Sequence, residues 1–185
     1  VVESGGQLHF STGTEYIGTG TITVQGDGYN RYKPDDFLQG ITKSGEVALY
    51  DGGILDASII NKTTLQNGGS IWLEGGLFEK AVTLGGVTGG GYVLVNPAKG
   101  DDKSTDIRFM ENANCKDADR IVAVGGNSAS SSLRFDKGLQ VGSLVLVTES
   151  TDKNVRTAAE FYGRVDASKD IIVSGAVGKF YGEVE

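Results

Sequence analysis

The sequence is poor in the side chains from which reactive and metal sites are most often built. Among 185 residues it has one cysteine, Cys115, and one histidine, His9. A lone cysteine excludes an intrachain disulfide, and it leaves no Cys/His set for a zinc ion. A catalytic triad would have to use His9, which lies in the alternating segment 7–10 and which we expect to point outward from a strand.

The sequence also has little proline, no long apolar run and fewer basic than acidic residues. Only 2 residues are proline, and no apolar run approaches the roughly 18 residues of a membrane helix. The 17 basic residues are outnumbered by 24 acidic ones, and the net charge of −7 repels phosphate backbones and anionic lipid headgroups. We therefore expect no nucleic acid partner and no membrane insertion. Because the sequence begins at Val1 rather than at methionine, we expect a processed mature protein or an excised segment.

Glycine and short apolar segments are abundant instead. Glycine, at 29 of 185 residues, has about twice its usual share. Apolar residues seldom recur at helical spacing, and the best helical candidate is residues 112–120. Short segments rich in Val, Ile, Leu, Phe and Tyr, bounded by Gly-, Asp- or Ser-rich turns, predict strands. They are 7–10, 21–24, 46–50, 70–73, 81–84, 92–95, 107–110, 120–124, 133–135, 143–148, 159–165 and 170–173.

An internal repeat appears when these segments are aligned with one another. Phe109, Phe135 and Phe161 each follow an apolar and a charged residue, and the interval from the first to the second equals that from the second to the third. Phe180 follows Phe161 at a shorter interval, and both begin the sequence Phe-Tyr-Gly-x-Val. Self-similarity at a nearly fixed period is the sequence signature of a repeat architecture.

Each of the three evenly spaced phenylalanines is followed by a second aliphatic strand, at 121–124, 144–147 or 171–173. A two-strand unit of about 25 residues cannot bury its own apolar face and must stack on like units. The sequence therefore predicts an all-β protein, a parallel β-helix (β-solenoid) that forms a single domain over residues 1–185. The phenylalanines would form an internal aromatic ladder, and glycine pairs would form the corners. A β-sandwich or jelly roll is the alternative, because it also has short strands with frequent turns.

Paired carboxylates are the first candidates for chemistry. Asp35 and Asp36 are adjacent, as are Asp101 and Asp102, with Asp106 nearby. Two carboxylates at suitable separation are what glycoside hydrolysis requires. Both sets lie in polar, turn-like surroundings, so we interpret them as solvated loops. Calcium is the one cofactor we keep as an alternative, because Asp101, Asp102 and Asp106 offer the hard oxygen ligands that it prefers.

Two short motifs are also weak. The glycine-rich run 85–91 lacks the Lys-Ser/Thr pair of a phosphate-binding loop, and no helix is predicted after it, so we interpret it as a corner. Asn61-Lys62-Thr63 matches the N-glycosylation sequon. A sequon has a consequence only in a eukaryotic secretory protein.

Aromatic side chains could bind sugars if they faced outward. Trp72, Tyr92, Tyr29 and Tyr32 are the candidates for such a stacking platform. We expect Trp72 and Tyr92 to pack in the core, since large aromatic side chains contribute most when they are buried. The sequence therefore assigns no catalytic, cofactor-binding or metal-binding residue.

The repeat resembles the β-helical passenger domains of bacterial autotransporter adhesins and the β-helical shafts of phage tailspikes and fibres. The resemblance rests on Gly-Gly corners after short aliphatic strands, as in residues 66–76, and on the Phe-led units from 107 to 184. It implies a stalk at a cell or virion surface whose long face displays binding loops. The chain departs from the passenger pattern in its higher charge and in having no visible polar cap at Glu185, which favours a fragment or an end-to-end stacking subunit.

From these features we expect a non-enzymatic structural or adhesive segment of an exported bacterial surface protein. Its location would be extracellular, at a cell or virion surface, and its partners would be proteins or carbohydrate, with self-association as a further possibility. A phage or virus structural protein, such as a tail fibre, spike or capsid-decorating subunit, is the first alternative. A polysaccharide-degrading β-helix enzyme that uses acidic residues is the second.

Overall fold

Nearly all the regular structure of the chain is β-strand. The computed structural model describes residues 1, 7–10, 20–25, 46–49, 55–73, 75–89, 91–95, 105–125, 130–148 and 152–185. Within them the only helix is α1 (Ala57–Asn61). The strands are β1 (Gln7–Phe10), β2 (Ile22–Gln25), β3 (Glu46–Leu49), β4 (Thr63–Gln66), β5 (Gly69–Leu73), β6 (Gly76–Phe78), β7 (Val82–Thr83), β8 (Gly86–Thr88), β9 (Gly91–Val95), β10 (Thr105–Phe109), β11 (Ala113–Gly125), β12 (Ser131–Phe135), β13 (Leu139–Thr148), β14 (Thr157–Phe161), β15 (Val165–Ala167), β16 (Ile171–Ser174) and β17 (Val177–Phe180).

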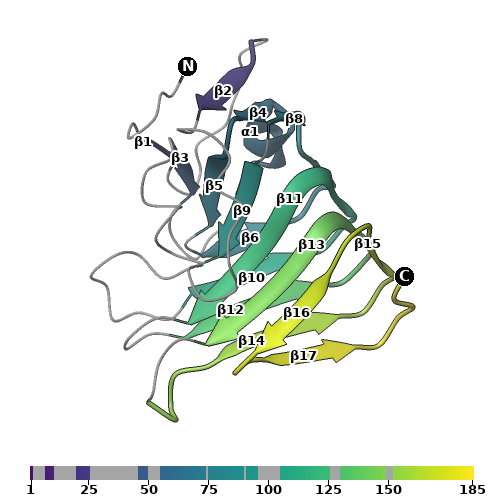
Figure 1. Ribbon diagram of the computed structural model, residues 1–185. Helices are drawn as coiled ribbons and strands as arrows, with labels where there is room; N and C mark the ends of the chain where they lie inside the picture. The colour runs from purple at the N-terminus through teal and green to yellow at the C-terminus, as the bar shows by residue number, and fades with distance from the viewer. Residues whose placement is uncertain are drawn as a thin grey trace.

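The strands form three sheets. The largest follows the order β1-β3-β5-β9-β11-β13-β15, with β7 also paired to β11 and β16 to β13. The second is the five-stranded sheet β17-β14-β12-β10-β6, and the third is β2-β4-β8. From β10 to β17 the chain alternates between the two larger sheets (Figure 1). Each new strand of the five-stranded sheet therefore lies beside the strand that the chain added to this sheet one passage earlier.

Every strand pair in the described residues is parallel. The protein is thus all-β with parallel sheets, as the sequence predicts. The sandwich or jelly-roll alternative requires antiparallel neighbours, which the described strands do not have.

The predicted stacking of phenylalanines is confirmed. Phe109 pairs in register with Phe135, Phe135 with Phe161, and Phe161 with Phe180. Their ring centroids are 4.6, 5.4 and 4.7 Å apart, with nearly parallel ring planes. Phe78 of β6 extends this phenylalanine ladder, with its ring 4.9 Å from that of Phe109.

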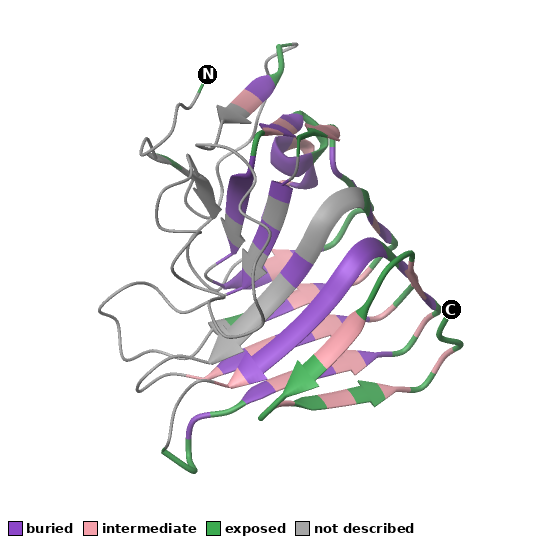
Figure 2. Cartoon of the chain, in the orientation of Figure 1, coloured by how far each residue is buried: buried purple, intermediate pink, exposed green. Residues whose placement is uncertain are grey.

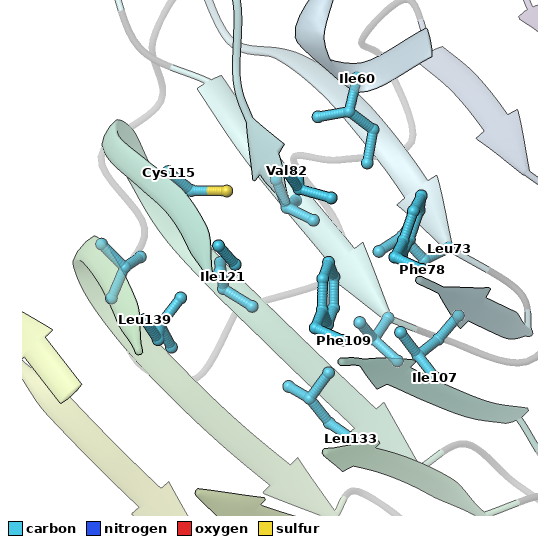
Figure 3. Close-up of a cluster of buried hydrophobic side chains, with 14 of the residues drawn as sticks. Ile60, Leu73, Phe78, Val82, Ile107, Phe109, Cys115, Ile121, Leu133 and Leu139 are labelled. Carbon is cyan, nitrogen blue, oxygen red and sulfur yellow. The ribbon is translucent and has the colours of Figure 1, made fainter. Parts of the chain in front are cut away.

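The core lies between the five-stranded sheet and the largest sheet and continues to the third sheet and α1, which contribute Ile22, Leu65 and Ile60. In β12 and β14 burial alternates, so that Leu133, Phe135 and Phe161 point inward while Arg134 and Glu160 do not. Figure 3 shows Phe78 and Phe109 among aliphatic side chains from the neighbouring strands, and Figure 2 shows that burial continues along β13. Each interior phenylalanine pair contributes about 0.5–1.5 kcal/mol beyond its area burial.

Close contact between successive passages explains the glycine of the Phe-Tyr-Gly-x-Val repeat. A β-carbon added at Gly163 would lie 2.6 Å from the carbonyl oxygen of Lys137, and one at Gly182 would lie 2.6 Å from the carbonyl carbon of Gly163. No side chain fits at either position. The predicted corner role holds at Gly68 and Gly76, whose φ values of 89° and 131° favour glycine.

The predicted helix at residues 112–120 is wrong, because these residues lie almost entirely in β11. The start of β11 pairs with β7 and its later part with β9, while β13 pairs with both parts across a register shift between Cys115 and Arg120. Partner strands on both sides outweigh a weak local preference. The actual helix, α1, begins after Asp56, whose carboxylate accepts a hydrogen bond from the Ser58 amide.

Candidate functional site

Most of the paired carboxylates singled out in the sequence lie outside the part of the chain that the structure describes. Asp35, Asp36, Asp101 and Asp102 lie outside the described residues. Asp106 is exposed on β10. The carboxylate pair and the calcium site therefore stay predictions.

The backbones of His9, Trp72 and Tyr92 lie in strands. His9 pairs with Ala48 between β1 and β3, and Trp72 pairs with Leu94 between β5 and β9. Tyr92 lies in β9, whereas Tyr29 and Tyr32 lie outside the described residues. We predict that His9 points outward and that Trp72 and Tyr92 pack in the core. Both statements stay predictions.

Cys115 is buried inside β11 rather than placed at a reactive surface. Its side chain is 3% exposed, and desolvation by burial raises the pKa of its thiol to about 12. The thiolate that nucleophilic or metal chemistry needs is therefore scarce at neutral pH.

The two short motifs serve local structure. Gly85 approaches the Thr63 carbonyl so closely that a β-carbon would lie 2.7 Å from its oxygen, and the run continues directly into strand β8. In the sequon, the side-chain oxygen of Asn61 accepts a hydrogen bond from the Thr83 amide at 2.7 Å. The Thr63 hydroxyl is buried and donates to the Ile59 carbonyl at 2.6 Å.

The outward face of the five-stranded sheet carries a connected row of polar and aromatic side chains, which we name the outer ladder. Its members flank the inward-facing phenylalanines on successive strands. They are Arg108, Arg134, Asp136, Glu160, Tyr162, Lys179 and Tyr181.

Ion pairs hold most of the outer ladder together. Asp136 receives hydrogen bonds from Arg108 at 2.6 and 2.9 Å and from Arg134 at 2.6 Å. Lys179 donates to Glu160 at 3.0 Å. The pKa of Asp136 is raised by desolvation but lowered by more through the hydrogen bonds and positive charges of the two arginines, so that it lies below its usual value. The hydrogen bonds from Lys179 and Tyr162 lower the pKa of Glu160.

The tyrosines of the outer ladder are engaged with each other. The rings of Tyr162 and Tyr181 stack with centroids 4.7 Å apart. The Arg134 guanidinium lies 4.5 Å from the centroid of Tyr162, in a cation–π contact. The ring of Tyr162 is therefore occupied by its neighbours and offers little free face to a ligand.

A groove lies where the chain passes from the five-stranded sheet to the largest sheet. We name it the corner groove. It is open to solvent and has a volume of about 520 Å³. Its lining comes from three successive passages of the chain: Asn112, Ala113, Asn114, Gly138, Leu139, Gln140, Arg164 and Asp166.

Strand register arranges the polar side chains of the corner groove in a row. Asn114 pairs with Gln140, and Gln140 pairs with Asp166. Their neighbours in the strands, Ala113 and Leu139, are buried, so alternation along the strands directs the polar residues outward. Adjacent members are separated by about 4.8 Å, the spacing of neighbouring strands.

Hydrogen bonds engage Asn112, Asn114 and Arg164 but leave Gln140 and Asp166 open. The Asn112 side chain accepts from the Gly138 amide at 2.9 Å, and that of Asn114 accepts from the Lys116 amide at 3.3 Å. Arg164 donates to the Glu185 carboxylate. The side chains of Gln140 and Asp166 make no hydrogen bond with the described residues. The groove thus presents the Gln140 amide and the Asp166 carboxylate to solvent.

No family model, curated protein or solved structure matches the chain. Within the described residues, no three His, Cys, Asp or Glu side chains come together as a metal-binding group. In the same part of the chain, no helix is both long and apolar enough to cross a membrane.

Sequence reasoning missed the corner groove, although the repeat contained its signal. The residues five positions after Phe109, Phe135 and Phe161 form the polar row of the groove. Extending the repeat alignment past each phenylalanine would have brought Asn114, Gln140 and Asp166 together. A helix over residues 112–120, as predicted, would not have paired Asn114 with Gln140.

Proposed function

We propose that the chain is a parallel β-helix, one domain over residues 1–185, that serves as a non-enzymatic structural or adhesive segment of an exported bacterial surface protein. The observation that carries the proposal is the repeated register. Phe109, Phe135 and Phe161 stack at equal sequence intervals while the chain alternates between two parallel sheets. This supports coils stacked on coils, which produce an elongated molecule with regular faces.

The chemistry of the outer face also supports a binding or structural role. The carboxylates of the outer ladder, Asp136 and Glu160, are held ionised by arginine or lysine, and neither is suited to donate a proton near neutral pH. Paired charges and stacked tyrosines form a stable, solvated surface instead. We propose an extracellular location at a cell surface, with proteins or carbohydrate as partners.

A virus or phage structural subunit at a virion surface is the second candidate. The exposed apolar side chains near β16 and β17 favour it, because Val173, Val177 and Tyr181 are 45%, 48% and 58% exposed. Exposed apolar groups beside open strand edges favour association with neighbouring copies.

The genomic setting tests the proposal. On either side of the region that encodes these residues, we expect an export signal upstream and a membrane-anchoring barrel downstream. Neighbouring genes for virion components would favour the second candidate instead. In sedimentation, a stable monomer at micromolar concentration would count against the virion subunit.

A further inference from the structure

The corner groove has polar groups at its surface that make no hydrogen bond with the described residues. Gln140 is exposed, and neither its amide nor the Asp166 carboxylate has a hydrogen-bond partner among the described residues. On the neighbouring coil, the oxygens of Asn112 and Asn114 accept from backbone amides, so their NH₂ groups are the donors left for a ligand. The groove therefore offers amide donors, an amide acceptor and a carboxylate acceptor side by side.

This donor and acceptor set matches a polyhydroxylated ligand. A sugar hydroxyl both donates and accepts, and planar amide and carboxylate groups bind such hydroxyls through two atoms at once. The row of Asn114, Gln140 and Asp166 spans about 10 Å across three strands, which suits a short oligosaccharide lying across the coils.

Charge decides which saccharides fit. Arg164 is paired with the Glu185 carboxylate, so Asp166 leaves the groove with a negative charge. The whole chain carries a net charge of −7, which repels acidic polymers further. The groove is thus matched to an uncharged saccharide rather than to a uronic acid polymer.

We infer that the corner groove is a binding site for a neutral oligosaccharide, with Gln140 and Asp166 as its central ligand-binding residues. This inference rests on the proposed adhesive function and gives it a location and a ligand class. The outer ladder is the poorer site, since its ion pairs and stacked rings already satisfy one another.

Titration of the isotope-labelled chain with cellohexaose, maltohexaose and chitohexaose, followed by backbone amide NMR, tests this inference. We expect at least one of these neutral probes to shift the amide signals of Asn114, Gln140 and Asp166, and a galacturonic acid hexamer not to. Substituting Gln140→Ala and Asp166→Ala together should weaken binding at least tenfold, because each change removes a hydrogen bond worth about threefold to tenfold. Neither side chain is buried or has a hydrogen-bond partner among the described residues, so the variant should keep its fold.

Asn154→Ala is the matched control, since Asn154 is an exposed amide residue beyond the opposite end of β13. It should bind as the parent does. The inference is overturned if no neutral hexamer shifts the groove signals, if shifts centre on Tyr162 and Tyr181, or if the double variant binds as tightly as the parent. None of these results would alter the genomic test, so the site and the surface role fail separately.

Discussion

At the scale of single residues, Asp136 joins two strands of the outer ladder through one carboxylate. It accepts hydrogen bonds from Arg108 on β10 and from Arg134 on β12, and its side chain is 18% exposed. The two arginines would otherwise repel each other, because they pair directly in register. A carboxylate between them turns this repulsion into a link between the two strands.

We expect Asp136→Asn to lower the free energy of unfolding by about 1 kcal/mol at neutral pH, at the upper end for an exposed ion pair. The folded pKa of Asp136 lies below its usual value, through the hydrogen bonds and charges of the arginines acting against desolvation. Its stabilisation is therefore complete above the unfolded pKa of about 3.9 and is lost as the pH falls through the folded value. The difference between the parent and the variant should shrink below about pH 4.

Urea unfolding at neutral and acidic pH measures this difference. Asp106→Asn provides the control, because Asp106 lies on the same sheet face, is exposed and makes no ion pair with the described residues. It should leave stability unchanged. A loss for Asp136→Asn that is equal at both pH values would mean that packing, not charge, explains the effect.

At the scale of elements, the phenylalanine ladder joins five strands of one sheet. Phe135 is 1% exposed and stacks on rings at both sides, whereas Phe180 is only partly buried and has Phe161 as its ring neighbour. The interior rung should therefore contribute more to stability than the terminal one.

We expect Phe135→Ala to lower the free energy of unfolding by about 3–5 kcal/mol and Phe180→Ala by roughly half as much. Phe135→Leu keeps most of the apolar volume but loses both ring contacts, so it should destabilise the protein less than Phe135→Ala does. Chemical denaturation followed by circular dichroism gives all three values. Equal losses at Phe135 and Phe180 would contradict a ladder with an interior and an end.

How far the elements follow from the sequence depends on their chemistry. The strands at Phe109, Phe135 and Phe161 were predictable, because their apolar, charged, Phe pattern repeats at one period. Strands β4, β6 and β8 were not, because threonine, glutamine and glycine dilute their apolar signal. Phe78 joins the ladder although its interval to Phe109 is longer than the repeat period, since the intervening connection alters the spacing and not the register.

At the scale of the whole molecule, the proposed β-helix would depend on contacts between each coil and its neighbours. Deleting residues 175–185 removes β17 and the Val165–Val184 bridge. If stability is a sum of neighbouring contacts, the shortened chain should stay folded with lower stability. Amide hydrogen exchange should show retained protection in β10 and β12 and reduced protection in β14, the new edge.

A complete loss of the strand signal in circular dichroism after this deletion would contradict stacked coils. It would indicate a core that forms only as one unit, in which every strand is required. The parent chain, measured under the same conditions, provides the reference.

The sequence by itself determined the inside of this protein. A repeated apolar pattern with a fixed period leaves each repeat only its neighbours to pack against, and this placed Phe109, Phe135 and Phe161 in one row. Only the tertiary structure decided the outside. Which polar side chains meet, as in the Asp136 ion pairs and the corner groove around Gln140, depends on strand register and on where the chain turns between sheets, and neither is encoded in the hydrophobic pattern.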